Sequence, residues 1–313
     1  MKKKFVYLTV GLILIFIILY FYLNQTSILK SSELISAYII VTKNFGKEVI
    51  IEKKVTVTLG ASALDALKMV ANVETAYGGG FVISINGIKS TYPKEPYDWF
   101  FYVNGFLAKE GASTYILSNN DFIQWDYHYW GNAFTPTATL AVYPNSFING
   151  YKGKVSPTLI VFQKEFSKEA EEIKSQLTQF NVKVETLPIE MITENEKSSC
   201  NIIILSKSDS KLVLELNGIH ERIGLQLYFK ENILIESNNV HKQYLKAGFI
   251  QALQNVWNPK GNMACENTIL LVSGTDVDSV KKAVNILLNL QEYKYSFGLI
   301  VTDQEVLMLP TET

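Results

Sequence analysis

Alternating polar and aromatic residues near the end of the first half of the chain are the strongest candidates for binding chemistry. A β-strand from Asp121 to Trp130 would point its side chains alternately to two faces. One face would be apolar core, formed by Ile123, Trp125, Tyr127 and Tyr129. The opposite face would combine polar groups with one aromatic ring, in the residues Gln124, Asp126, His128 and Trp130. Ligand pockets have this mixture of an apolar surface with a few orienting polar groups.

Aromatic residues that precede this strand extend the candidate site. Tyr97 and Trp99 could line the same region, which makes a predicted ligand-binding set of Tyr97, Trp99, Gln124, Asp126, His128 and Trp130. Small domains also bury aromatic rings for stability, and burial explains Trp99 and Trp125 better than ligand contact does. Within the set, His128 and Trp130 are therefore the favoured ligand contacts.

Patterns typical of catalysis or metal binding are weak in this sequence. His128, His220 and His241 have no partners at metal-ligand spacing, and no nucleophile is paired with a base. The run from Tyr77 to Gly80 lacks the Lys-Ser or Lys-Thr of a phosphate loop and is interpreted as a flexible turn. The run from Ser273 to Asp276 is interpreted as a helix cap, with anion binding as the alternative. We expect a protein that is not an enzyme and that holds no metal.

The two cysteines each stand just ahead of a predicted strand. Cys200 precedes a strand that begins at Asn201, and Cys265 precedes one that begins near Thr268. Entrances of parallel strands lie along one sheet edge, and neighbours about 4.8 Å apart could bring the thiols within bridging range. A disulfide would then form in an oxidising compartment. Two separate buried thiols are the alternative, and the bridge is slightly favoured.

The first half of the chain has the order of elements of a β-grasp. Alternating residues predict strands at 37–41 and 49–58, joined by a turn at Asn44-Phe45-Gly46-Lys47. Ser62 and Asp65 then mark the start of a short helix. Three later strands are predicted at 81–85, 99–103 and 122–129, the first two ending in Asn-Gly turns. The order is typical of an α+β domain with a sheet wrapped across one helix.

Several motifs in this half resemble a known family. They are the segment from Pro96 to Gly105 (PYDWFFYVNG), Gly111, Tyr115, the segment from Asp121 to Trp125 (DFIQW), and the helix start from Leu59 to Leu67. Residues 35–130 resemble the transcobalamin C-terminal-like module, which is β-grasp-like and occurs in animal cobalamin carriers and in bacterial and archaeal envelope domains. The resemblance implies that the module acts as a lid over a ligand, with a corrinoid as one candidate. The helical barrel of the animal carriers does not precede it here.

The second half has a different pattern of predicted strands and helices. Residues 134–157 contain Pro and Gly breaks but are too apolar for a solvated linker, so we expect them to pack between residues 31–133 and residues 158–313. Strands are predicted at 159–162, 182–187, 202–205, 269–272 and 299–301, and helices at 167–180, 240–256 and 276–290. Short apolar strands alternating with helices predict an α/β domain with a mostly parallel sheet.

The N-terminus carries a membrane signal. Three lysines, Lys2 to Lys4, precede an apolar run from Phe5 to Leu23, close to the about 20 residues that span a bilayer as a helix. The flanking charge predicts a single-pass anchor within residues 1–30, with a cytoplasmic N-terminus and the bulk of the chain outside. A cleaved signal peptide is the alternative. With 29 basic and 30 acidic residues the chain has no field that attracts nucleic acid.

Two functions fit these features. In the first, the two halves form a cleft at Thr135 to Gly153 and capture a corrinoid or other small molecule for a membrane transporter. In the second, exposed aromatic residues contact an envelope protein or a surface polymer. A concave pocket between the halves favours ligand capture, whereas a flat aromatic patch favours a protein partner.

Overall fold

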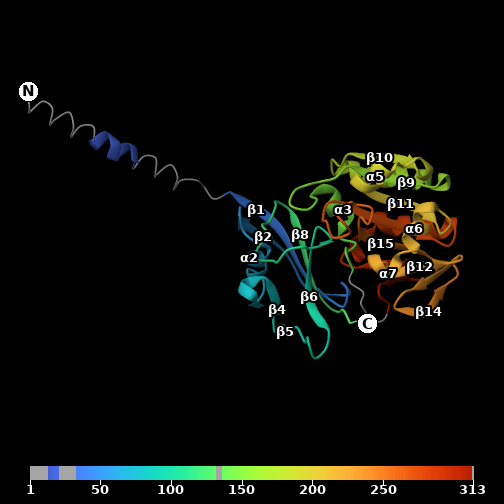
Figure 1. The fold of residues 1–313 in the computed structure, drawn as a ribbon, viewed down its shortest axis with the longest axis horizontal. Coiled ribbons are helices and arrows are strands. Elements are labelled where there is room, and N and C mark those ends of the chain that lie inside the picture. Colours follow the sequence, from blue (N-terminus) through green and yellow to red (C-terminus); the bar gives the residue numbers. More distant parts are fainter. Residues whose placement is uncertain (1–12, 21–32, 132–135, 312–313) are drawn as a thin grey trace, which may run out of the picture.

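The computed structural model describes residues 13–20, 33–131 and 136–311 of the chain (Figure 1). Residues 13–20 are helical, with exposed apolar side chains. The apolar run predicted as a membrane anchor, Phe5 to Leu23, lies mostly outside the described residues. Within the described part, no helix combines the length and the apolar character that crossing a membrane requires.

A five-stranded mixed sheet forms the frame of the first half. Its strands are β1 (Leu34–Lys43), β2 (Glu48–Thr58), β6 (Tyr97–Val103), β7 (Phe106–Leu107) and β8 (Asp121–Tyr129), in the order β2-β1-β8-β6-β7. The central pair β1 and β8 is parallel, and the other neighbours are antiparallel. The predicted hairpin forms because Asn44, Phe45 and Gly46 all adopt positive φ in the turn.

Helix α2 (Ala63–Lys68) packs against one face of this sheet. The Ser62 hydroxyl accepts a hydrogen bond from the Asp65 amide at 3.1 Å, and the Asp65 carboxylate accepts one from the Ser62 amide at 2.9 Å. Leu67 of the helix and Trp125 of the sheet belong to one buried apolar cluster. A small antiparallel sheet of β3 (Val73–Ala76), β4 (Phe81–Ile85) and β5 (Ile88–Lys89) follows, with the 3-10 turn η1 (Tyr77–Gly79) between β3 and β4. The predicted order of an α+β half is therefore present.

The segment between the halves is buried rather than solvated. Helix α3 (Val142–Ile148) contributes Val142 and Phe147 to the largest apolar cluster of the second half. The Asn104 side chain of the first half donates to the Gly150 carbonyl at 2.7 Å. The Leu140 amide donates to the Ser296 carbonyl of the second half at 2.9 Å. This segment thus contacts both halves.

A seven-stranded mixed sheet is the centre of the second half. Its strands are β9 (Thr158–Phe162), β10 (Val184–Pro188), β11 (Asn201–Lys207), β15 (Gly248–Gln254), β16 (Thr268–Gly274), β17 (Gly298–Val301) and β18 (Val306–Met308). The order is β10-β9-β11-β16-β15-β17-β18. The first four strands in this order are mutually parallel, and β15, β17 and β18 join by antiparallel pairing.

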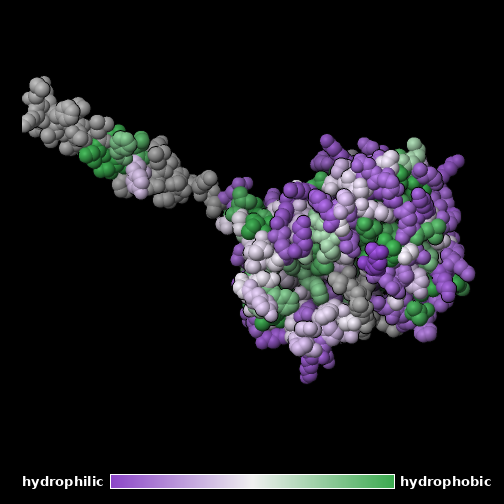
Figure 2. Space-filling view, in the orientation of Figure 1, coloured by the Kyte–Doolittle hydropathy of each residue, from purple (hydrophilic) through white to green (hydrophobic). Residues whose placement is uncertain are grey.

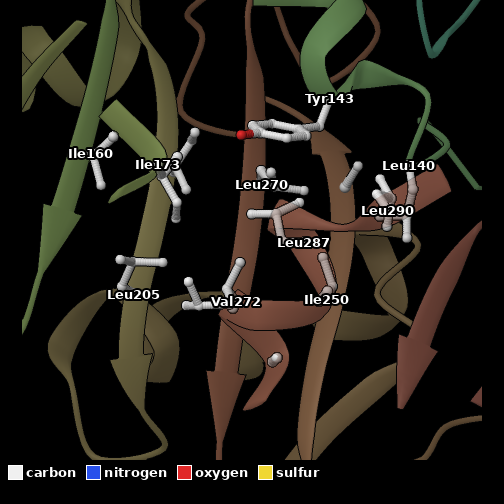
Figure 3. Close-up of a cluster of buried hydrophobic side chains, with 14 of the residues drawn as sticks. Leu140, Tyr143, Ile160, Ile173, Leu205, Ile250, Leu270, Val272, Leu287 and Leu290 are labelled. Atoms are coloured by element: carbon white, nitrogen blue, oxygen red, sulfur yellow. The ribbon is translucent and has the colours of Figure 1, made fainter. Parts of the chain in front are cut away.

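Apolar clusters cover both faces of this sheet. On one face, α3 packs with α4 (Ser167–Gln179) and α8 (Val277–Leu288), and Figure 3 shows part of this cluster around Leu270. The other face packs on α6 (Lys211–Asn217), α7 (His220–Ile223) and the antiparallel sheet of β12 (Leu227–Lys230), β13 (Ile233–Glu236) and β14 (Asn239–Tyr244). The remaining short elements are α5 (Glu194–Ser199), η2 (Lys164–Phe166), η3 (Ile189–Met191) and η4 (Leu290–Glu292).

Two sequence-based predictions for this half are wrong. A helix was predicted at 240–256, but these residues lie mostly in strands β14 and β15. All seven residues of β15 are buried, because apolar layers cover both faces of the sheet, so the strand lacks the alternation that would distinguish it from a buried helix. The sheet is also not mostly parallel, because β15 enters it between β16 and β17 with antiparallel pairing on both sides.

Candidate functional site

The polar face of β8, predicted to meet a ligand, is buried where the two halves of the chain meet. Gln124, Asp126 and His128 are fully buried. The Gln124 side chain donates to the Tyr295 carbonyl of the second half at 2.8 Å. Tyr102 of neighbouring β6 contacts Phe297 of the second half, with ring centroids 5.2 Å apart. The predicted ligand surface is therefore an internal contact between the halves, which corrects the expectation of an open face.

Protein groups occupy the acceptor sites of the Asp126 carboxylate. The Thr42 hydroxyl donates to it at 2.6 Å, and the amides of Phe45 and Gly46 donate at 3.0 and 2.8 Å. His128 Nδ1 lies 2.7 Å from Asp126 Oδ1. A carboxylate with this many partners is held as a structural group, because a buried charge is stable only when it is paired and hydrogen-bonded.

Aromatic rings enclose the His128 imidazole. Phe45 and Phe100 stack on it with centroids at 4.3 and 4.5 Å, and Phe297 meets it edge-on at 5.5 Å. His128 Nε2 is buried and makes no hydrogen bond. The Asp126 and His128 pair is thus enclosed by protein groups from both halves of the chain.

The other predicted contacts, Tyr97, Trp99 and Trp130, lie apart from this pair. Trp99 is in the core between the sheet and α2, and its indole nitrogen donates to the Ile88 carbonyl at 2.9 Å. Tyr97 is half-buried and stacks on Tyr127 at 5.7 Å. Trp130 is half-buried and donates to the Asp98 carboxylate at 2.9 Å. Strand alternation places Tyr97 and Trp99 on the opposite face of the sheet from Gln124, Asp126 and His128, so the six predicted residues do not surround one cavity.

The two cysteines are free thiols, so the predicted Cys200–Cys265 disulfide does not form. Cys200 packs in the second half, whereas Cys265 extends into the core of the first half and donates its thiol to the Leu107 carbonyl at 3.4 Å. The strands that follow the two cysteines, β11 and β16, are parallel neighbours, as the prediction required. Cys265 lies three residues before β16, and its side chain belongs to the apolar cluster of the first half, whereas Cys200 belongs to a cluster of the second half. Burial raises the pKa of both, that of Cys265 to about 11.

A pocket of about 380 Å³ lies between the two halves. The first half contributes Tyr38 and Ile40 of β1, Glu52 of β2 and Phe122 of β8. The opposite wall comes from α3, α4, the end of α8, η4 and the segment after η4, with the residues Tyr143, Pro144, Asn145, Ile148, Gln176, Phe180, Leu287, Leu288, Leu290, Gln291, Lys294 and Tyr295. Figure 3 shows Tyr143 reaching from α3 across the apolar cluster that includes Leu287 and Leu290. In Figure 2 apolar patches are visible on both halves and near where the halves meet, among hydrophilic residues that dominate the visible second half.

Polar groups in the pocket wall are largely bonded to one another. The Tyr143 hydroxyl donates to Gln176, and the Gln176 amide donates to the Leu288 carbonyl at 2.9 Å. Lys294 pairs with Glu52 at 2.9 Å. The Tyr295 hydroxyl is buried without a hydrogen bond of standard geometry. The Tyr295 hydroxyl nevertheless lies close to Glu52. Tyr295 and Lys294 together lower the pKa of the Glu52 carboxyl.

Burial raises the pKa of both tyrosine hydroxyls in the wall, those of Tyr143 and Tyr295. Both are therefore neutral hydrogen-bonding groups near neutral pH. Apolar walls with a few fixed polar groups are typical of small-molecule sites. This pocket is the candidate functional site, and its arrangement is suited to binding.

Sequence reasoning located part of this site. The predicted cleft segment, Thr135 to Gly153, contains α3, which lines one wall. The other contributors, such as Tyr38 and Tyr295, were not predicted. They are far apart in the chain and stand in no motif. Their shared signal is only that each is an aromatic residue near a strand, which is too common to single them out.

Comparisons with known proteins match part of the chain. Residues 60–129 match the model of a domain of unknown function (DUF4430). Haptocorrin in complex with Cbi is 18% identical over 31% of this chain and 25% of its own, with a TM-score of 0.27. A protein from Ruminococcus gnavus whose proposed role is metal binding is 14% identical over 30% of this chain and 95% of its own, with a TM-score of 0.24. This chain thus spans about a quarter of the length of haptocorrin. No curated protein matches the sequence.

Proposed function

We propose that this chain is a ligand-binding protein that holds a small, mostly apolar molecule between its two halves. The observation that carries the proposal is the pocket of about 380 Å³ to which both halves contribute aromatic and aliphatic side chains. Ligand pockets typically measure about 300 to 1,000 Å³ and are lined mainly by such groups. A concave site between two domains is also a preferred location for ligands.

The protein is proposed to work outside the cytoplasm. Lys2 to Lys4 ahead of the apolar run Phe5 to Leu23 support a membrane anchor with a cytoplasmic N-terminus. An anchored binding protein could pass its ligand to a membrane transporter or to another envelope protein. Fractionation of cells, followed by protease treatment of intact cells, tests this part: loss of residues 33–311 to the protease is expected, and full protection would contradict it.

Binding without chemical conversion is the proposed activity. The described residues that line the pocket include no serine, cysteine or histidine. Among all described residues, no group of three or more His, Cys, Asp or Glu side chains is arranged to hold a metal ion.

A corrinoid is the ligand that the sequence resemblance implies. The pocket is at the lower end of the size range for drug-sized ligands, so a corrin ring would enter only in part. Adhesion through exposed aromatic residues receives less support. Trp99 and Trp125 are buried, and Trp130 is half-buried, so they do not form an open aromatic patch.

Calorimetric titration of the full chain in detergent tests the proposal with two probes. 2-Naphthol represents a small apolar ligand, and cobinamide represents a corrinoid. Replacing half-buried Leu288 in the pocket wall by tryptophan would fill the cavity, so Leu288→Trp should lose 2-naphthol binding.

Leu214→Trp is the matched control, because Leu214 is 56% exposed on α6 and does not line the pocket. It should bind 2-naphthol like the wild type. Equal binding by wild type and Leu288→Trp would exclude the pocket as the site. Saturable heat with cobinamide would support the corrinoid, whereas its absence would leave a smaller ligand as the proposal.

A further inference from the structure

The charges that line the pocket neutralise each other. Among the described lining residues, only Glu52 and Lys294 carry charge. Lys294 Nζ lies 2.9 Å from Glu52 Oε1, which joins β2 of the first half to the segment before β17 of the second. Lys294 also lies over the Tyr295 ring, 4.7 Å from its centroid. Each charge in the wall therefore already has its partner within the protein.

We infer that the ligand of this pocket is an uncharged, largely apolar molecule. This inference rests on the proposed function of the pocket. A charged ligand would either lie unpaired against aromatic and aliphatic walls or separate Glu52 from Lys294. Burying a charge without a partner is strongly unfavourable, so the first arrangement weakens binding strongly. The second breaks an ion pair whose side chains are 35% and 51% exposed, so its cost is smaller. An uncharged molecule meets neither penalty.

The polar groups of the wall limit the ligand to few hydrogen bonds. The Gln176 side chain is bonded through both its oxygen and its nitrogen, to Tyr143 and to the Leu288 carbonyl. The Asn145 amide donates to the Ala141 carbonyl at 2.8 Å. The Tyr295 hydroxyl is buried in the wall and interacts with the Glu52 carboxylate, so it is not a free partner for a ligand.

Three naphthalene probes with the same ring and different charge test the inference in the full chain. 2-Naphthol is neutral, 2-naphthoate is an anion, and 2-naphthylmethylammonium is a cation at neutral pH. Titration calorimetry against a detergent-matched blank gives each affinity. We expect the wild type to bind 2-naphthol at least about tenfold more tightly than either charged probe.

Variants that leave one wall charge unpaired should change this preference in opposite directions. Glu52→Gln leaves Lys294 without its partner, so the affinity for 2-naphthoate should rise by about tenfold. Lys294→Met leaves Glu52 unpaired, so the affinity for the ammonium probe should rise by a similar factor. Lys54→Gln is the matched control, because Lys54 is exposed, contacts the Tyr38 ring at 5.1 Å and does not line the pocket. It should leave all three affinities unchanged.

The outcomes separate this inference from the proposed function. If a charged probe binds the wild type as tightly as 2-naphthol and Leu288→Trp abolishes that binding, the pocket binds ligands but the neutral class is wrong. If no probe binds the wild type, both the inference and the proposed function fail. The expected neutral preference, reduced toward 2-naphthoate in Glu52→Gln and toward the ammonium probe in Lys294→Met, supports both.

Discussion

Asp126 Oδ1 lies 2.7 Å from His128 Nδ1, and both side chains are fully buried at the contact between the two halves. The same carboxylate accepts the amides of Phe45 and Gly46, so it also fixes the turn between β1 and β2. Phe297 of the second half then packs against both Phe45 and His128. One buried carboxylate therefore organises the surface on which the halves meet.

Removing this carboxylate should strongly destabilise the protein. Asp126→Ala leaves His128 and two backbone amides without an acceptor in a buried environment, and breaking a buried pair typically costs about 3 to 5 kcal/mol. We expect the free energy of unfolding from urea titration to fall by that amount. Asp209→Ala is the control, because the Asp209 side chain is 64% exposed, and it should change stability by about 1 kcal/mol or less. Equal effects of the two substitutions would refute the structural role of Asp126.

The free state of the cysteines can be counted directly. Because Cys200 and Cys265 pack in different apolar clusters, protein purified and unfolded without reductant should release two titratable thiols per chain. In the folded protein, alkylation near pH 8 should be slow, since buried, protonated thiols react poorly. Finding no thiols after unfolding would mean that the bridge forms.

The stability of the fold should depend on the protonation of Cys265 at alkaline pH. Burial raises the pKa of its thiol to about 11 from the ordinary value of 9.0. The folded state therefore holds this proton more tightly than the unfolded state does. The resulting stabilisation is fully present below about pH 9 and is lost as the pH rises toward about 11. Thermal unfolding of Cys265→Ala should show a shallower decline across this window than the wild type. If the melting temperatures of the two proteins decline equally with pH, the thiol does not contribute to the pH dependence of stability.

Gly248 permits the close approach of α8 to strand β15. A Cβ atom at this position would lie 2.2 Å from the Ser279 carbonyl oxygen, which is backbone and cannot rotate away. Gly248→Ala should therefore lower the free energy of unfolding by about 1 to 3 kcal/mol or more. Gly218→Ala is the matched control, because a Cβ there would make only ordinary contacts, the nearest at 3.5 Å. If calorimetry shows comparable losses of unfolding free energy for the two variants, the predicted clash does not occur.

The start of α2 depends on the reciprocal hydrogen bonds between Ser62 and Asp65. Ser62→Ala removes the oxygen that accepts the Asp65 amide and should cost about 0.5 to 2 kcal/mol of stability. Ser62→Thr keeps a hydroxyl at the cap and should recover most of that loss in the same denaturant titration. No recovery by threonine would indicate that packing of Ser62, rather than its hydroxyl, is responsible.

Local sequence signals predicted much of the first half. The turn at Asn44 to Lys47, the cap at Ser62 and the strand that ends in Tyr129 all follow from short-range preferences that packing does not override. In the second half, β15 was mistaken for a helix, because burial on both faces removes the alternation by which a strand is recognised. Local patterns identify an element only when its two faces meet different environments.

The alternation in β8 by itself determined which residues share a face, and the structure keeps Gln124, Asp126 and His128 together on one side of the sheet. Only the tertiary structure decided what covers that side. Phe297 and Tyr295 pack there from the second half, and the pocket opens nearby between Tyr38 and Tyr143 instead. The physical reason is that periodicity reports the direction of side chains along one strand, whereas burial depends on surfaces brought together from distant parts of the chain.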